Sequence, residues 1–161
     1  NCHVFCDTMI VNGTLLAGHV HVHDKAIISG NVAVHQFCSV GRLAFIGGCA
    51  RVVVDVPPFM MYEGTDNPGV RTLNSVGMQR AGIGPASIAA LKQAYKLMFR
   101  EHKPLHEVKA ILGGENIESI PMELGELFSF LDRQRLGRMG RGREVVRSQP
   151  FQLAPLKNRA A

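Results

Sequence analysis

Single aliphatic residues recur every six positions through the first third of the chain. Written in sixes from Val4, the sequence reads VFCDTM, IVNGTL, LAGHVH, VHDKAI, ISGNVA, VHQFCS, VGRLAF, IGGCAR and VVVDVP, and all nine units begin with Val, Ile or Leu. The fifth residue of each unit is small or β-branched. A continuous helix repeats near 3.6 residues and a strand at 2, so neither explains this period. The period is typical of a hexapeptide β-helix, in which each unit supplies one short strand and one turn.

Three such units close one triangular coil, which brings residues 18 apart into vertical register at about 4.8 Å, the spacing of hydrogen-bonded strands. The aliphatic residue that begins each unit points inward and contributes about 1.5 to 3 kcal/mol when it is fully buried. The fifth residue also points inward, so it must be small. The register predicts four stacks, namely Asn1 over His19 over Phe37, His3 over His21, Gly18 over Gln36, and Ala17 over His35.

The chain begins at Asn1 in the middle of a repeat and without a methionine. Repeat proteins normally cover the ends of their apolar core, and a bare first coil would leave an unpaired strand edge. From the sequence we therefore expect a C-terminal fragment whose earlier coils, of unknown number, are missing.

The sequence changes character after Val56, where two consecutive prolines interrupt the strand ladder and later glycines permit a loop. Apolar residues then recur at helical spacing, which predicts one helix that begins at Pro85, a second from Pro104 to Leu112 and a third from about Pro121 to Leu136. We expect a β-helix over 1–56, a loop and short helical connection over 57–83, a helical domain over 84–136, and a basic, poorly ordered tail over 137–161.

The formal net charge of +5 is concentrated at the C-terminal end, where residues 133–161 carry eight basic groups against the single Glu144. The stretch RQRLGRMGRGREVVR contains no aromatic residue that could stack on bases, and its glycines disfavour a regular helix. We expect a solvated extension and no nucleic-acid partner. An electrostatic contact site for acidic groups is the alternative.

Other function classes are disfavoured by what the sequence lacks. No apolar run approaches the roughly 20 residues that span a bilayer, and the first residues given show no charged region followed by an apolar stretch, so we expect a cytoplasmic protein without stable membrane insertion. The four cysteines lack the paired spacing of a zinc site, and we expect buried free thiols. We expect no metal, because zinc needs ligands that converge at about 2.0 to 2.1 Å, and the coil histidines are not placed to do so. These histidines are His3, His19, His21, His23 and His35.

Five motifs carry a resemblance to a known family. They are LAGHV at Leu16–Val20, VHQFCSVG at Val34–Gly41, IGGCA at Ile46–Ala50, DVPPF at Asp55–Phe59 and AYKLMFR at Ala94–Arg100. Together they resemble the UDP-N-acetylglucosamine O-acyltransferases, over a span from Asn1 to about Phe130. That family moves a 3-hydroxyacyl chain from acyl carrier protein to the 3-hydroxyl of UDP-N-acetylglucosamine, the first step of lipid A biosynthesis.

The resemblance implies a mainly β fold, a left-handed parallel β-helix of hexapeptide repeats followed by a C-terminal α-helical domain. It also implies a homotrimer whose active sites lie between adjacent prisms. The implied partners are acyl carrier protein with a 3-hydroxyacyl thioester, and UDP-N-acetylglucosamine. No cofactor is expected.

Two catalytic positions follow from the resemblance. Gly18 matches a glycine whose backbone N–H stabilises the oxyanion when the thioester is attacked. Asn1 and Cys2 match the second and third members of a sequence that runs His, Asp or Asn, Cys, in which the histidine is the general base. That base would directly precede Asn1, so we expect residues 1–161 alone to be inactive. An amide at Asn1 can hold the tautomer of the base but cannot offset imidazolium charge.

Substrate-binding positions are implied in the same way. His19 matches a histidine that contacts the sugar, His35 and Gln36 match positions along the nucleotide and acyl portions, Asn74 matches a nucleotide contact, and Arg80 matches an arginine that binds the UDP phosphates. A guanidinium can bind two phosphate oxygens at once. Ala81 replaces a second arginine and Val76 replaces an acidic residue of the family pattern, which leaves the details of nucleotide binding open.

Gly48 resembles the position that sets acyl-chain length, where a bulky side chain blocks the far end of the hydrocarbon groove. Each additional buried CH₂ contributes about 0.8 kcal/mol, so the length of the groove controls chain selectivity. We expect Gly48 to admit a chain of about fourteen carbons, subject to crowding by Phe45.

Other functions remain open from the sequence. A non-catalytic trimeric scaffold or nucleotide-sugar-binding protein would keep the same surface without turnover. Acetyl-CoA-dependent transfer or a zinc hydratase would use the same prism with another substrate. The related N-acyltransferase of lipid A synthesis is disfavoured, because DVPPF and the three helices match the O-acyl enzyme better.

Overall fold

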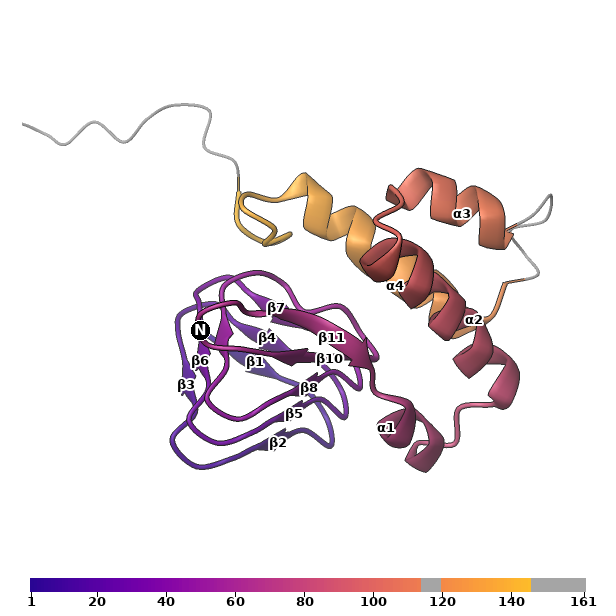
Figure 1. Ribbon diagram of the computed structural model, residues 1–161. Helices are drawn as coiled ribbons and strands as arrows, with labels where there is room; N and C mark the ends of the chain where they lie inside the picture. Colours follow the sequence, from indigo (N-terminus) through magenta and orange to yellow (C-terminus); the bar gives the residue numbers. More distant parts are fainter. Residues whose placement is uncertain (114–119, 146–161) are drawn as a thin grey trace, which may run out of the picture.

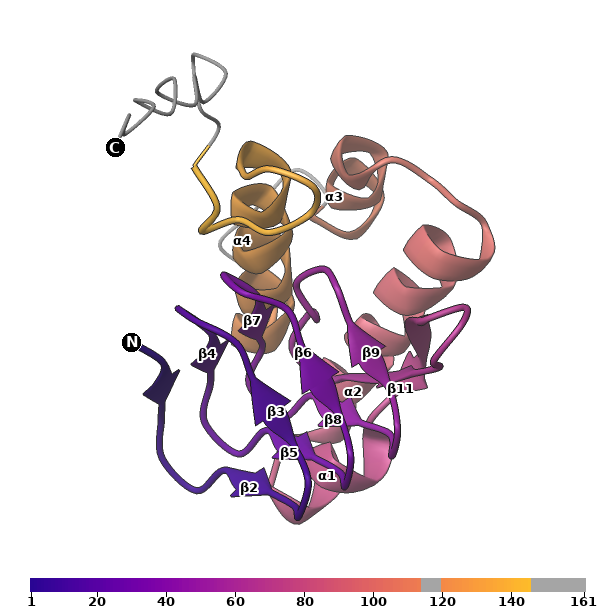
Figure 2. The ribbon, with the colours of Figure 1, turned by 90° about the vertical axis from the view of Figure 1, so that its left-hand side faces the viewer.

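The computed structural model describes residues 1–113 and 120–145, and its first half is a parallel β-helix (Figure 1). Nine two-residue strands follow one another at six-residue intervals: β1 (His3–Val4), β2 (Met9–Ile10), β3 (Leu15–Leu16), β4 (His21–Val22), β5 (Ile27–Ile28), β6 (Ala33–Val34), β7 (Ser39–Val40), β8 (Phe45–Ile46) and β9 (Arg51–Val52). They form three sheets: sheet A (β1, β4, β7), sheet B (β2, β5, β8 and two later strands) and sheet C (β3, β6, β9). Figure 2 shows the three faces of the prism.

Residues 18 apart pair in register, as the repeat predicts. His3 pairs with His21, and His21 in turn pairs with Ser39, all in parallel. His19 stacks on Phe37 with ring centroids 5.0 Å apart and an interplanar angle of 9°. The hexapeptide β-helix is therefore confirmed.

Each turn at a corner of the prism contains one residue with a left-handed backbone conformation. One residue in each unit, from Asp7 to Cys49, has a positive φ, and only one of these eight residues is a glycine. L-residues adopt this left-handed conformation at some cost, so the surrounding ladder must hold it in place. This geometry directs the side chains at the corners away from the core of the prism, where most are exposed and Leu43 packs against the helices.

The inward columns form the core of the β-helix. The aliphatic residues that begin the units are at most 3% exposed from the second coil onward; they are Val22, Ile28, Val34, Val40, Ile46 and Val52. Cys38 lies in the inward fifth-position column and is buried, but the other three cysteines are exposed. The expectation of four buried thiols was therefore wrong, because Cys6 and Cys49 lie in turns and Cys2 lies on the first coil.

The segment 57–83, expected to be a loop and short helical connection, contains two strands, β10 (Met60–Glu63) and β11 (Gly69–Leu73), before helix α1 (Ser75–Arg80). β10 pairs in parallel with β8, with Met61 opposite Phe45, and β11 pairs antiparallel with β10. The prediction was wrong on this point because Pro57 and Pro58 precede β10. There they remove no ladder hydrogen bond.

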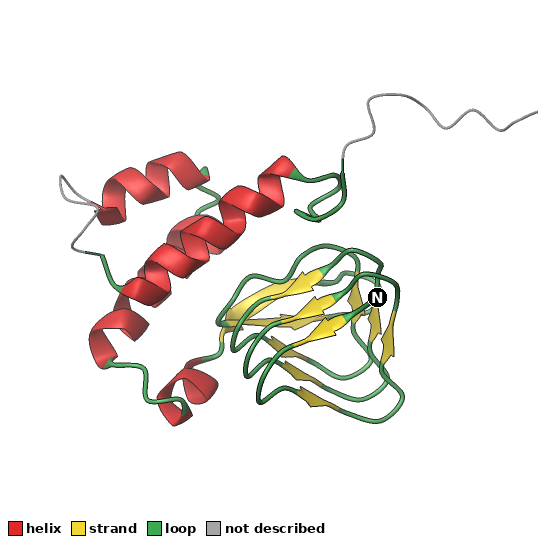
Figure 3. Ribbon diagram, turned by 180° about the vertical axis from the view of Figure 1, so that it is seen from behind, coloured by secondary structure: helices red, strands yellow, loops and turns green. Residues whose placement is uncertain are grey.

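The helices pack at the end of the coil (Figure 3). They are α2 (Pro85–Tyr95), which continues into a π-helical turn η1 (Lys96–Arg100), α3 (Leu105–Gly113) and α4 (Met122–Leu136). These bounds lie within about one residue of those predicted. Leu91, Val108 and Leu127 form one buried cluster with Phe59 and Met60 of the last coil. In the described part of the chain, no helix has the length and apolarity needed to cross a membrane.

Residues 137–145 return from the end of α4 to the β-helix. Arg141 is 8% exposed, and its guanidinium donates to the carbonyl of Val53 at 2.8 Å. Gly142 N–H donates to the carboxylate of Asp55 at 2.7 Å. The predicted poorly ordered tail is therefore wrong for these residues, because polar groups of the last coil bind them. Residues 146–161 lie outside the described residues.

Candidate functional site

Four of the predicted site residues lie on one corner, between sheets C and A. We call this set, Gly18, His19, His35 and Gln36, the histidine corner. Its two turns stack directly, since Phe37 N–H donates to the carbonyl of Gly18 at 3.0 Å. The repeat register alone produces this convergence.

Gly18 is exposed at the histidine corner with an unobstructed approach. A Cβ added to Gly18 would meet nothing within 4 Å. Within residues 1–113 and 120–145, no acceptor lies in hydrogen-bond range of its backbone N–H. The N–H can therefore donate to a ligand, which is what an oxyanion requires.

The ring of His19 is held in a defined orientation. His19 has φ 63°, which turns the corner, and its ring lies flat on Phe37. The backbone carbonyl of His19 accepts a hydrogen bond from the guanidinium of Arg143 at 2.5 Å. A residue near the end of the described chain thus supports this turn.

His35 has a defined tautomer. Its Nδ1 lies 2.9 Å from the carbonyl oxygen of Gln36, and a carbonyl only accepts, so we assign the proton to Nδ1. The Nε2 atom then carries a lone pair. The exposed ring can accept a proton or a hydrogen bond from a ligand through Nε2.

Residues 1 and 2 lie on the same corner, one coil above Gly18. The thiol of Cys2 donates to the carbonyl of Ala17 at 3.0 Å, and the next strand begins at His3. Asn1 is exposed. The structure therefore places Asn1 beside the histidine corner, as the register predicts.

Arg80 and Asn74 lie elsewhere, in a groove on sheet B. We call this cavity of about 270 Å³, lined by Ile27, Phe45, Met61, Leu73, Asn74, Ser75, Val76, Gly77 and Arg80, the α1 groove. Asn74 caps α1, because its Oδ1 accepts from Gly77 N–H at 3.0 Å and its Nδ2 donates to the carbonyl of Leu43 at 2.9 Å. One hydrogen and one lone pair of the Asn74 amide remain for a ligand.

Phe45 and Gly48 are separated by the turn that follows β8. Phe45 contributes to the wall of the α1 groove, whereas Gly48 is exposed at the corner between sheets B and C. A Cβ at Gly48 would meet only the carbonyl oxygen of Gly30, at 3.7 Å. The position therefore has room for a larger side chain.

The predicted site residues thus form two groups in one chain. The histidine corner joins sheets A and C, and the α1 groove lies on sheet B, across the apolar core from that corner. The two groups therefore lie on different faces of the same prism.

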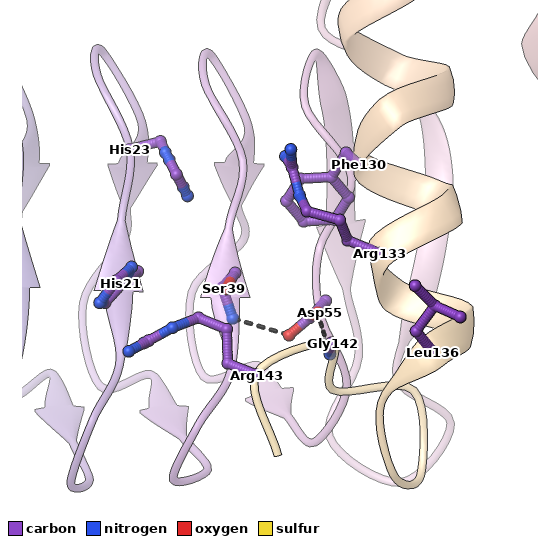
Figure 4. Close-up of a pocket in the computed structure, with 9 residues that line it drawn as sticks. All are labelled: His21, His23, Ser39, Asp55, Phe130, Arg133, Leu136, Gly142 and Arg143. Carbon is purple, nitrogen blue, oxygen red and sulfur yellow. Dashed lines mark hydrogen bonds between the residues drawn. The ribbon is translucent and has the colours of Figure 1, made fainter. Parts of the chain in front are cut away.

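Sequence reasoning missed one cluster, on the face of sheet A. His21, His23, Ser39, Asp55, Phe130, Arg133, Leu136, Gly142 and Arg143 line a cavity of about 370 Å³, which we call the β4–α4 pocket (Figure 4). Burial raises the pKa of Asp55, against the lowering effect of hydrogen bonds from Gly142 and Ser39 N–H. The one sequence signal was a pair of outward histidines, His21 on β4 and His23 directly after it. Within the described ranges, no three His, Cys, Asp or Glu side chains converge as metal ligands.

Comparisons with known proteins agree on one family. The family model described as UDP N-acetylglucosamine O-acyltransferase, domain 2, matches residues 55–140. The acyl-[acyl-carrier-protein]–UDP-N-acetylglucosamine O-acyltransferase of Synechocystis sp. is 44% identical over 114 residues, which cover 70% of this chain and 41% of that protein. The enzyme of the same name from Aliivibrio fischeri is 42% identical over 130 residues, or 81% of this chain and 49% of that protein.

Solved structures show the same likeness. LpxA from Acinetobacter baumannii has a TM-score of 0.72 at 32% identity, over 80% of this chain and 49% of that chain. The Arabidopsis UDP-N-acetylglucosamine acyltransferase has a TM-score of 0.70 at 32% identity, over 81% and 46%. The chain thus spans less than half the length of these relatives.

Proposed function

The chain belongs to the UDP-N-acetylglucosamine O-acyltransferase family, and on that premise we propose that the protein transfers a 3-hydroxyacyl chain from acyl carrier protein to the 3-hydroxyl of UDP-N-acetylglucosamine. This reaction is the first step of lipid A biosynthesis, and we place it in the cytoplasm. The observation that carries the proposal is the convergence of Gly18, His19, His35 and Gln36 on one exposed corner.

The reaction balances without a redox partner. The sugar oxygen forms a bond to the thioester carbon, the carbon–sulfur bond breaks, and the hydroxyl proton passes through the base to the leaving thiolate. Gly18 N–H stabilises the tetrahedral oxyanion, which is worth about 3 to 4 kcal/mol for one well-placed donor. Asn1 orients the general base, which the family resemblance places directly before it.

The histidine corner positions the sugar in this proposal. The stacked ring of His19 contacts the sugar, and the Nε2 lone pair of His35 accepts a hydrogen bond from the substrate, with Gln36 beside it. Arg80 binds the UDP phosphates through its guanidinium, and the remaining amide groups of Asn74 contact the nucleotide.

The two groups of site residues support a homotrimer. Because the α1 groove and the histidine corner lie on opposite sides of one prism, the groove of a second copy must face this corner to complete a site. In the homotrimer that the family resemblance implies, cyclic symmetry repeats this contact three times. Phe45 and Gly48 line the hydrocarbon path beside the groove in this arrangement.

Subunit complementation tests the shared site. We expect His19→Ala and Arg80→Ala each to abolish acyl transfer by the natural-length protein, measured as 3-hydroxyacyl-UDP-N-acetylglucosamine formed from acyl carrier protein thioester. Co-expression of the two variants should restore about one quarter of the wild-type rate, because a random mixture makes one interface in four with both residues intact. A mixture no more active than either variant would contradict the shared site.

Binding measurements separate this function from the scaffold alternative. The protein should bind UDP-N-acetylglucosamine and turn it over when the acyl donor is added. Saturable binding of the nucleotide sugar with no transfer by the natural-length protein would favour the nucleotide-sugar-binding scaffold instead. Transfer from acetyl-CoA in preference to the acyl carrier protein thioester would point to the other acyl donor.

A further inference from the structure

The β4–α4 pocket has the dimensions of a ligand site and lies outside the proposed acyl-transfer residues. Its volume of about 370 Å³ falls in the range of small-molecule pockets. Its walls come from distant parts of the chain: β4 and β7 on one side, α4 on another, and the returning residues 142 and 143 on the third (Figure 4).

Two guanidinium groups line this pocket without a carboxylate partner. Within residues 1–113 and 120–145, neither Arg133 nor Arg143 forms an ion pair, since the nearby Glu126 and Glu144 pair with Arg42 and Arg141. Arg143 donates instead to the backbone carbonyl of His19. Most of the hydrogen-bonding capacity of both groups is therefore available to a ligand.

Asp55 is the one carboxylate among the lining residues, and both of its oxygens are already engaged. Oδ1 accepts from Ser39 N–H at 2.8 Å, and Oδ2 accepts from Gly142 N–H at 2.7 Å. Figure 4 shows Asp55 held between these two residues. Asp55 thus offsets one positive charge, but its two oxygens already accept hydrogen bonds from the backbone of the pocket wall and are not free to bind a ligand.

His21 presents a buried polar atom without a partner. Its Nε2 is enclosed and makes no hydrogen bond within the described ranges. Such an atom is rare in native proteins and calls for a specific partner. Burial, with the charge of Arg143 second, lowers the pKa of His21 to about 4, and burial with Arg133 lowers that of His23. Both imidazoles are therefore neutral near pH 7 while the pocket is empty.

One side of the pocket is apolar. Phe130 is 6% exposed and Leu136 is 80% exposed, so the wall offers a buried aromatic ring and an open aliphatic rim. A ligand that fits these walls has an anionic head and a small apolar body.

We propose that the β4–α4 pocket binds a phosphate monoester that carries a small apolar group. A phosphate presents three oxygens that can accept hydrogen bonds from the guanidinium groups of Arg133 and Arg143, and its negative charge then lies near the His21 ring. The charges also balance. A phosphate dianion and Asp55 carry three negative charges, and two guanidinium groups with a protonated His21 carry three positive charges. Binding is therefore coupled to uptake of one proton by His21.

Calorimetric titration with phenyl phosphate tests the proposal, with inorganic phosphate as the probe that lacks the apolar group. We expect saturable one-to-one binding of phenyl phosphate, tighter than inorganic phosphate, and a heat that changes with the ionisation enthalpy of the buffer. Arg133→Gln and Arg143→Gln should each weaken binding by about tenfold, as expected for loss of a charge-assisted hydrogen bond. Arg135→Gln is the matched control, because Arg135 is exposed on the same helix but does not line the pocket.

NMR of the wild-type imidazoles provides a second readout that does not depend on any variant folding. Bound phenyl phosphate should raise the pKa of His21 from about 4 toward neutrality. The absence of saturable binding below about 1 mM would overturn the proposal. Equal weakening by Arg135→Gln, or an unmoved His21 resonance, would also overturn it. Displacement of phenyl phosphate by UDP-N-acetylglucosamine would show that the pocket is part of the nucleotide-sugar site, which would overturn a separate site.

Discussion

The inward column of aliphatic residues makes a quantitative prediction for Ile28. This side chain is 0% exposed and lies between Ile10 and Ile46 of the neighbouring coils. Ile28→Ala removes three carbons, or about 2.4 kcal/mol at roughly 0.8 kcal/mol for each. The coils above and below are held by their own ladders and close the gap only in part, so the cavity raises the expected loss to about 3 to 4 kcal/mol.

The adjacent Ile27 is the matched control, because it has the same side chain on the same strand but points outward, into the α1 groove. We expect Ile27→Ala to cost about 1 kcal/mol, since a partly exposed side chain loses less buried apolar surface when it is truncated. Urea unfolding at one fixed protein concentration measures both variants, with unchanged slopes as the check on a common unfolding reaction. A loss for Ile27→Ala equal to or larger than that for Ile28→Ala would refute the inward and outward assignment.

Asp55→Ala should lower the free energy of unfolding by about 2 to 3 kcal/mol, because the backbone N–H groups of Ser39 and Gly142 lose their acceptor. Removal of the buried carboxylate charge offsets only part of this loss. Urea unfolding measures this, and a stability equal to wild type would exclude the anchoring role. Acidification from pH 7 toward pH 4 should lower the melting temperature, because the unfolded chain takes up a proton near pH 6.5 that folded His21, with a pKa of about 4, does not. His21→Gln should reduce the change of melting temperature with pH, and an unchanged pH dependence would contradict the low pKa of His21. The charged or titratable neighbours that face His21 are Arg143, His3 and His23. Gly48→Met in the natural-length enzyme should shorten the preferred acyl chain, measured by mass spectrometry of products from mixed donors, and an unchanged preference would show that Gly48 does not set the length.

The repeat made most of the β-helix predictable. Its inward columns and its 18-residue register follow from local sequence, so the stack of His19 on Phe37 and the pair of His3 with His21 could be derived before any coordinates. The helices were also predictable within about one residue, because prolines and apolar spacing mark their ends. Gly18, His35 and Gln36 converge for the same reason.

Other parts of the molecule had no such signal. β10 lies beyond two prolines, and it forms a strand because β8 offers it an unpaired edge. The α1 groove requires α1 to be fixed by Asn74 on the carbonyl of Leu43, which is 31 residues away. The roles assigned to Asn1, Asn74, Arg80 and Gly48 remain proposals.

By itself, then, the sequence determined the coil. Each six-residue unit buries one aliphatic side chain and one small residue, and this modest stabilisation recurs in every unit of the stacked coils. The tertiary structure alone decided how residues 137–145 join the solenoid. Gly142 reaches Asp55 across 87 residues, and Arg143 reaches His19 across 124. Each of these contacts is a single hydrogen bond between residues far apart in the sequence. A periodic pattern along the chain does not predict such a pair.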